Sequence, residues 1–282
     1  MSLTNWQIKK AEYWKKFPPP ARPWTEEVSI FEKYVIEKQE QGHSPCDVLV
    51  LGSTVELRSM CHKNKTNVSI VDFSKIFYDI LSKQPMAYQG KEVLYEQNWL
   101  VMDIGKKFDL IFGDWVPNVL RVQEFSRFFE NILRHLKDDG LFIARECLRP
   151  NREPIDLKKV VNDHNEHYGK AYSFYETSMH YVYGFRIYEE TSTWNIPAAR
   201  EAVEDVYRKG LLKKKDHDFF MDALALEIDH SMTIMVEEDF DDMVQNYFTI
   251  MGKHRADVPS KEWFPIYVLA KKGSKKKVRS LF

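Results

Sequence analysis

The stretch Val48-Leu49-Val50-Leu51-Gly52-Ser53-Thr54-Val55-Glu56 indicates the fold of this chain of 282 residues. Its first four residues form a continuous apolar run, which is typical of a strand buried on both faces of a parallel sheet. Gly52 follows and allows a sharp turn without a Cβ atom between backbone and ligand. Ser53 and Glu56 have the spacing of a capping box, which predicts that a helix begins at once. The N–H groups at that helix start favour an anion.

The same alternation of strand and helix continues to about residue 147. The apolar runs that predict further strands are Val68–Val71, Val93–Tyr95, Phe108–Phe112 and Leu141–Ala144. An amphipathic helix is expected from Val122 to Leu136, with its end at Asp138-Asp139-Gly140. This order predicts a doubly wound, mostly parallel sheet, in which ligands bind at the carboxyl ends of the strands.

The chain divides into five segments on its sequence pattern. Helices broken by the prolines at 18–20 are expected over residues 1–45, the α/β core over 46–150 and a helical insertion over 151–235. A closing helix and the last strands follow over 236–272, and a basic tail containing Lys275 to Lys277 over 273–282. We interpret the insertion as a lid on the substrate side.

The insertion is rich in aromatic residues, and these have two interpretations. They form the apolar face by which the insertion packs on the sheet, which we favour, or they line a substrate pocket. The residues are Tyr172, Phe174, Tyr175, Tyr181, Tyr183, Phe185 and Tyr188. Three histidines of the same segment, His164, His167 and His180, are candidates for a general base, although a lone histidine is more often a packing residue.

Composition argues against several classes of protein. The 41 lysines and arginines balance 42 aspartates and glutamates, so the net charge predicts neither nucleic-acid nor membrane binding. The three cysteines have no metal-ligand spacing, and we expect reduced thiols, no metal site and a cytoplasmic protein. The sequence shows no signal-peptide pattern and no apolar run that could span a bilayer.

Polar residues end several of the predicted strands. Asp72 lies twenty residues after Gly52, where an acid of nucleotide-binding folds accepts hydrogen bonds from ribose hydroxyls. Asn98 and Trp99 follow the third strand, and Asp114 follows the fourth. A purely structural role remains the alternative for three of these residues. Asp72 would cap a helix, Asn98 would stabilise a turn and Asp114 would be an acid at a helix start.

In this order of strands, turn and acids, residues 46–147 resemble the class I S-adenosylmethionine-dependent methyltransferases, with a variant first motif. The resemblance implies a seven-stranded sheet with N-terminal helices and a helical insertion before the last two strands, near 247 and 264. It also implies a set of cofactor-binding residues. Gly52 and Ser53 would border the methionine part, Asp72 would hold the ribose, Asn98 and Trp99 would form the adenine pocket, and Asp114 and Trp115 would lie beside the reacting centre.

The chain departs from the family pattern at four places. Val50 stands where the family usually has an acid, and Thr54 and Glu56 stand where it has further glycines. Asp114-Trp115-Val116-Pro117 is not the Asn/Asp-Pro-Pro-Tyr motif of enzymes that methylate amino groups of nucleic acids. This lowers the expectation of a nucleic-acid substrate.

The resemblance implies in-line methyl transfer from S-adenosylmethionine, which we expect to act on a small-molecule acceptor. One alternative is an RNA methyltransferase that uses Lys213 to Lys215 and the basic tail. Another is a non-catalytic cofactor-binding or scaffold protein. A nicotinamide-dependent oxidoreductase would need a Gly-x-Gly-x-x-Gly turn, which is absent. The sequence assigns no catalytic residue and no oligomeric state.

Overall fold

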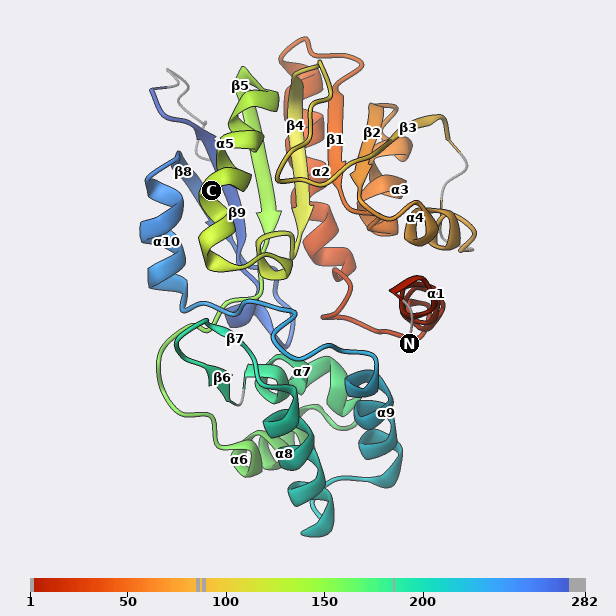
Figure 1. Cartoon of the computed structure of the whole chain (residues 1–282), viewed down its shortest axis with the longest axis vertical. Coiled ribbons are helices and arrows are strands. Elements are labelled where there is room, and N and C mark those ends of the chain that lie inside the picture. The colour runs from red at the N-terminus through yellow and green to blue at the C-terminus, as the bar shows by residue number, and fades with distance from the viewer. Residues whose placement is uncertain (1–2, 85–86, 88–89, 185, 274–282) are drawn as a thin grey trace.

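The computed structural model describes residues 3–84, 87, 90–184 and 186–273 (Figure 1). Phe185 and the tail lysines Lys275 to Lys277 lie outside these residues. The strands are β1 (Asp47–Leu51), β2 (Asn67–Asp72), β3 (Glu92–Glu96), β4 (Phe108–Asp114), β5 (Leu136–Arg145), β6 (Ile187–Tyr188), β7 (Thr193–Trp194), β8 (Phe248–His254) and β9 (Ile266–Lys271). The helices are α1 (Leu3–Trp14), α2 (Thr25–Glu40), α3 (Val55–Lys63), α4 (Lys75–Leu81), α5 (Phe125–His135), α6 (Leu157–Asp163), α7 (Phe174–Gly184), α8 (Ile196–Arg208), α9 (Lys214–Ala225) and α10 (Glu237–Gln245).

Seven strands form one sheet in the order β3-β2-β1-β4-β5-β9-β8. Strands β1 to β5 are parallel to one another, and β9 is antiparallel to both β5 and β8. The strand order reverses between β1 and β4, which is the position where open α/β sheets bind ligands. The predicted seven-stranded, mostly parallel sheet is confirmed.

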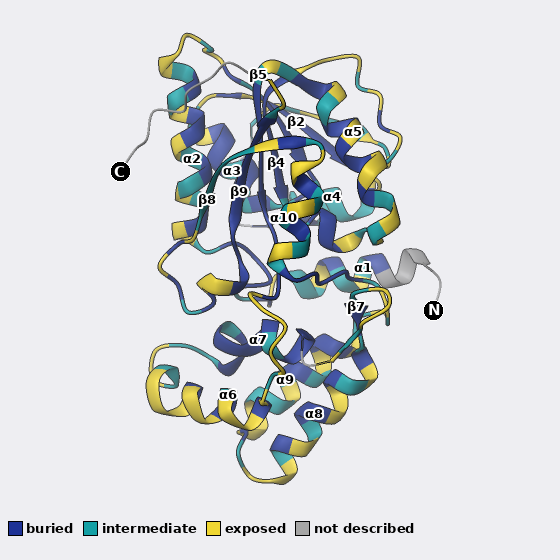
Figure 2. Cartoon of the chain, turned by 90° about the vertical axis from the view of Figure 1, so that its left-hand side faces the viewer, coloured by how far each residue is buried: buried dark blue, intermediate teal, exposed yellow. Residues whose placement is uncertain are grey.

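The apolar run in β1 is buried because helices cover both faces of the sheet (Figure 2). Val48 and Val50 pack against α2 and α3 on one face. Leu49 and Leu51 belong to the core of the other face, with α5 and α10. Alternate side chains of one strand thus enter two separate cores, so the strand has no polar face and reads as a continuous apolar run.

The boundary between α5 and β5 differs from the prediction. The helix ends at His135 and β5 begins at Leu136, so Asp138, Asp139 and Gly140 lie within the strand. The pairing with β4 moves from Leu136 opposite Phe108 to Leu141 opposite Leu110, so the residues between them form a bulge. The turn-forming residues Asp138, Asp139 and Gly140 therefore form this bulge in β5 and do not end the helix.

Gly140 allows this bulge because a Cβ atom there would lie 2.9 Å from the Phe108 carbonyl oxygen and 3.1 Å from the Lys137 nitrogen. We expect Gly140→Ala to destabilise the protein by about 1–3 kcal/mol, because backbone atoms must move. Gly252→Ala is the control, since its nearest contact would be the end of the His254 side chain at 3.4 Å. Thermal unfolding of both variants checks this, and equal melting temperatures would contradict it.

In its described residues, the segment between β5 and α10 contains the α-helices α6 to α9, a π-helical turn at His164–Tyr168 and the short hairpin of β6 and β7. It lies below the carboxyl edge of the sheet in Figure 1. Its core joins α7 and α9 to residues of the core domain, including Phe17, Trp263 and Phe264. Phe174, Tyr175 and Tyr183 are buried in this separate core, so they pack at the edge of the sheet and not on its faces. In the part of the chain that the structure describes, no helix has the length and apolar character that a membrane span requires.

Candidate functional site

A cavity of about 520 Å³ lies at the carboxyl ends of β1, β2 and β4. Its volume is in the range of pockets for small molecules and cofactors. All seven residues predicted to bind a cofactor line it: Gly52, Ser53, Asp72, Asn98, Trp99, Asp114 and Trp115. They come from four separate places in the sequence, and the sheet brings them together.

The turn after β1 has the glycine conformation that was expected. Gly52 has φ +81°, a left-handed value, and its N–H donates to the Val71 carbonyl at 2.8 Å. A Cβ atom at Gly52 would meet nothing closer than a Trp99 ring atom at 3.6 Å. The backbone angle, and not lack of space, therefore favours glycine here.

The predicted capping box at Ser53 and Glu56 is wrong. Helix α3 starts at Val55 with Thr54 as its N-cap, and no side chain caps it. The Ser53 hydroxyl instead donates to Asp72 Oδ2 at 2.6 Å, and Glu56 Oε1 accepts from Arg22 Nε at 2.6 Å. Each side chain has a charged tertiary partner, and hydrogen bonds of this type are stronger than a neutral cap.

Asp72 ends β2 and is held on both oxygens. Oδ2 accepts from Ser53 and Oδ1 accepts from the Ser74 N–H at 2.9 Å. Burial raises the pKa of Asp72, and the bond from Ser53 opposes that rise. A carboxylate oxygen can accept more than one hydrogen bond, so this fixed group can still receive hydroxyls of a ligand.

Two aromatic rings stand next to Asp72. Trp99 is buried and its Nε1 donates to the Val71 carbonyl at 2.8 Å. Phe73 is 54% exposed, lines the cavity and lies edge-on to Trp99 with ring centroids 6.3 Å apart. The sequence reasoning missed Phe73, although an aromatic residue directly after the acid at a strand end was a usable signal.

Asn98 lines the cavity but is exposed, and its side chain serves its own turn. Its Oδ1 accepts from the Leu100 N–H at 2.8 Å. This contact is the one that the alternative interpretation of Asn98 as a turn residue predicts.

Asp114 is held by a buried arginine that the sequence reasoning also missed. Arg145 is fully buried at the end of β5, and its Nη1 lies 2.8 Å from Asp114 Oδ1. Its Nε lies 2.8 Å from Glu27 Oε2, and its Nη2 donates to the Pro20 carbonyl at 2.7 Å. One guanidinium therefore links β4, β5, α2 and the segment that follows α1.

Trp115 has φ +57°, a left-handed value that bulky residues rarely adopt. Its N–H donates to the Arg145 carbonyl at 2.8 Å, and its ring stacks on Phe264 with centroids 5.5 Å apart and planes 5° apart. Arg145 also lies over the Phe264 ring, 4.6 Å from its centroid. Strained conformations of this kind persist where surrounding contacts hold them, and they gather at functional sites.

No family model matches the chain, and no curated protein matches it. Solved structures do. A putative zinc-dependent alcohol dehydrogenase from Rhodobacter sphaeroides is 17% identical over 96% of this chain and 100% of that chain, with a TM-score of 0.57. A glycopeptide N-methyltransferase complexed with S-adenosylhomocysteine is 9% identical over 85% of this chain and 89% of that chain, with a TM-score of 0.50.

The chain has the class I methyltransferase fold. At 17% and 9% identity the similarity concerns the fold alone. Zinc dependence and alcohol dehydrogenase activity belong to the name of the Rhodobacter sphaeroides protein and are not transferred to this chain. Open α/β sheets bind ligands at the carboxyl ends of their strands, where the cavity lies.

The one group of the described residues that could hold a metal ion lies elsewhere in this methyltransferase fold. His43, Asp109 and Asp139 lie near the amino ends of the strands, the edge opposite the cavity. Lys137 Nζ lies 2.9 Å from Asp109 Oδ2, and Lys38 Nζ lies 3.0 Å from Asp139 Oδ2. These carboxylates already have cationic partners, so the donor set does not fit a metal site.

The three histidines considered as bases do not line the cavity. His164 is bonded to Thr177 Oγ1 at 2.8 Å, and His167 is exposed. His180 packs against Trp263 and Phe264, and burial lowers its pKa to about 3, so it is neutral at physiological pH. These side chains fit the packing and surface interpretation.

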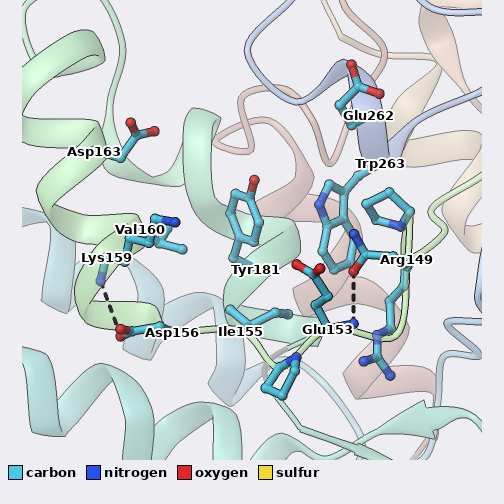
Figure 3. Close-up of a pocket in the computed structure, with 13 residues that line it drawn as sticks. Arg149, Glu153, Ile155, Asp156, Lys159, Val160, Asp163, Tyr181, Glu262 and Trp263 are labelled. Carbon is cyan, nitrogen blue, oxygen red and sulfur yellow. Dashed lines mark hydrogen bonds between the residues drawn. The ribbon is translucent and has the colours of Figure 1, made fainter.

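A second hollow, of about 570 Å³, is lined by residues of α6, α7 and the stretch from Arg149 to Asp156 (Figure 3). Tyr181 and Trp263 form one wall, with Arg149 and Lys159 as the cations among its lining residues. Its carboxylates are Glu153, Asp156, Asp163 and Glu262. None of the predicted site residues lines this second hollow, so the cavity at the strand ends is the candidate site.

Glu146 is a buried acid directly after Arg145. Neither of its carboxyl oxygens has a hydrogen-bond partner among the described residues. Burial, reinforced by the nearby charge of Asp114, raises the pKa of Glu146 well above its ordinary value of 4.5. Burial therefore favours the neutral form of this carboxyl beside the Arg145 and Asp114 pair.

We expect Glu146 to contribute stability that is lost as the pH rises above 4.5, because the folded state retains a proton on Glu146 that the unfolded chain releases. Each pH unit costs about 1.4 kcal/mol until the folded pKa is reached. Glu146→Gln removes this dependence, so its stability relative to the wild type should increase from pH 4.5 to 7.5. Melting temperatures across this range test it, with Glu130→Gln on the exposed face of α5 as control. A constant difference between Glu146→Gln and the wild type would refute it.

Proposed function

We propose that this protein is an S-adenosylmethionine-dependent methyltransferase that acts on a small molecule. The observation that carries the proposal is the meeting of seven predicted residues around one cavity in the methyltransferase fold. Their positions at the ends of separate strands agree with the order that the resemblance implied. The residues at one end of the cavity also have the chemistry of the cofactor's parts.

The adenosine part of the cofactor fits the β2 side of the cavity. Asp72 is fixed by Ser53 and Ser74 and has lone pairs for the two ribose hydroxyls. Phe73 and Trp99 present aromatic surfaces next to it, which suit the flat adenine ring. Asn98 lies in the same wall and would contact the edge of the base.

The methionine part fits the β1 and β4 side. Gly52 lets the backbone approach closely, and the N–H groups at the start of α3 would receive the carboxylate. Asp114, paired with Arg145, would lie beside the cationic end. When bound, the cofactor supplies the electrophilic methyl group, so the chain's own residues must mainly bind, align and exclude water.

A small acceptor is favoured over RNA because α1 and the insertion form the far side of the cavity. Residues of α1, α7 and β7 line it together with the strand ends. Lys213 to Lys215 are exposed at the start of α9 and do not line the cavity. With a net charge of −1, the chain has no overall attraction for nucleic acid.

Calorimetric titration with S-adenosylhomocysteine tests the cofactor site. We expect micromolar binding to the wild type and loss of detectable binding in Asp72→Ala, because the ribose loses its acceptor. Ser53→Ala, which frees the Asp72 carboxylate, should weaken binding about fivefold to tenfold, the effect of one hydrogen bond of about 1 kcal/mol. Asp79→Ala is the control, since this exposed aspartate of α4 does not line the cavity.

If the wild type does not bind, the departures at Val50, Thr54 and Glu56 have removed the cofactor site, and the scaffold alternative takes first place. Binding without turnover on any acceptor would indicate a cofactor-binding protein without catalysis. Binding that Asp72→Ala leaves unchanged would show that the cofactor lies elsewhere.

A further inference from the structure

Part of the cavity wall comes from α1 and from the stretch that follows α9. Gln7 and Lys10 of α1 line the cavity, and so do Glu227 and Ser231. Gln7 and Lys10 are one helical turn apart, so they lie on the same face of α1. None of these four residues belongs to the predicted cofactor set, so this wall is the part of the cavity that is left for an acceptor.

Glu227 has one carboxylate oxygen that a ligand can reach. Its side chain is 7% exposed, and its Oε2 lies 2.8 Å from Lys10 Nζ. Its Oε1 has no hydrogen-bond partner among the described residues, and it is not one of the buried oxygens that are closed off from solvent. A carboxylate oxygen in this position can accept a hydrogen bond from a molecule in the cavity.

Gln7 presents a second open acceptor. The residue is 8% exposed, and no hydrogen bond joins its side-chain amide to any described residue. Buried polar side chains normally have partners, so an amide that lines a cavity without one is a place where a ligand gains a hydrogen bond. Because Lys10 lies one turn away and binds Glu227, the two open acceptors belong to the same part of the wall.

The charges of the wall favour a cation in the cavity. Among the described residues that line it, the cationic side chain is Lys10 and the carboxylates are Asp72, Asp114, Glu124 and Glu227. Arg145 pairs with Asp114 from outside the wall, and Lys10 pairs with Glu227. Asp72 and Glu124 have no ion-pair partner among the described residues. The cofactor would bring one net positive charge, so one carboxylate would remain uncompensated in the loaded cavity, and an anionic acceptor would be repelled.

We propose that the methyl acceptor is an amine whose nitrogen binds at Glu227 Oε1 and at the Gln7 amide oxygen. An ammonium group has three N–H donors, which are enough for both acceptors, and its charge matches the wall. Glu227 and Gln7 are then the specificity-determining residues. The role of the amine as methyl acceptor rests on the proposed function, whereas its binding does not.

The transfer step balances with this acceptor. The bound ammonium first loses one proton to solvent and becomes a neutral nucleophile. Its nitrogen then forms a bond to the methyl carbon while the bond from that carbon to sulfur breaks, and the electron pair of the broken bond stays on sulfur. The methylated nitrogen carries the positive charge that the sulfur has lost, and one proton is released overall.

The test compares three probes that share one flexible chain, in calorimetric titrations against the full chain at pH 7.5. Hexylamine is a cation, 1-hexanol is a neutral donor and hexanoate is an anion. We expect hexylamine to bind about fivefold more tightly than 1-hexanol and about tenfold more tightly than hexanoate, because charge-assisted hydrogen bonds are roughly twice as strong as neutral ones. Equal affinities, no binding of hexylamine, or a preference for 1-hexanol or hexanoate would overturn the proposal.

Variants locate the amine. Glu227→Gln keeps the size of the side chain but removes its charge, and Gln7→Met removes the amide. Each should weaken hexylamine about fivefold, the effect of one hydrogen bond. For Glu227→Gln the readout is the ratio of hexylamine to 1-hexanol affinity, because a folding defect would weaken both probes alike. Glu166→Gln, an exposed site on the insertion, is the control and should leave this ratio unchanged. A wild-type ratio in Glu227→Gln would refute the assignment.

S-adenosylhomocysteine affinity, measured on the same samples, separates this inference from the proposed function. If hexylamine binds with the expected preference but S-adenosylhomocysteine does not bind, the amine site stands and the proposed function fails. If S-adenosylhomocysteine binds but the preference for hexylamine is absent, only this inference fails.

Discussion

The contacts of Arg145 are the constraint on which the site depends. A fully buried guanidinium must have partners, because an unpaired charge in the interior would unfold this part of the protein. Glu27 and Asp114 supply the opposite charges, and the Pro20 carbonyl takes a further N–H. The end of β4, the end of β5 and the N-terminal segment are therefore fixed relative to one another by one side chain.

Two consequences follow for the cavity. The N-terminal segment, held near Pro20, leads from α1, which lines one side of the cavity. The backbone of Trp115 is bonded to Arg145, and this contact, with the stacking on Phe264, holds its left-handed conformation. Arg145 does not itself line the cavity, so it positions the site residues from outside the cavity wall.

The polar groups near the strand ends form linked pairs. Ser53 fixes Asp72, Arg22 pairs with Glu56, and Arg145 pairs with Asp114, while burial raises the pKa of the nearby Glu146. Orientation of a ligand in a low-dielectric cavity requires polar groups that do not move, and each of these is held by a partner or by burial.

The sequence by itself determined the parallel sheet, because β1 is buried on both faces and its apolar run can be read locally. It also predicted that Gly52, Asp72, Asn98 and Asp114 would meet, because the carboxyl ends of parallel strands share one edge. Only the tertiary structure decided the partners. Ser53 and Glu56 have a valid local capping pattern, yet they bind Asp72 and Arg22, which the fold brings within reach. The contacts of Arg145 and the Lys10–Glu227 pair join residues separated by up to 217 positions, and no local pattern encodes such contacts.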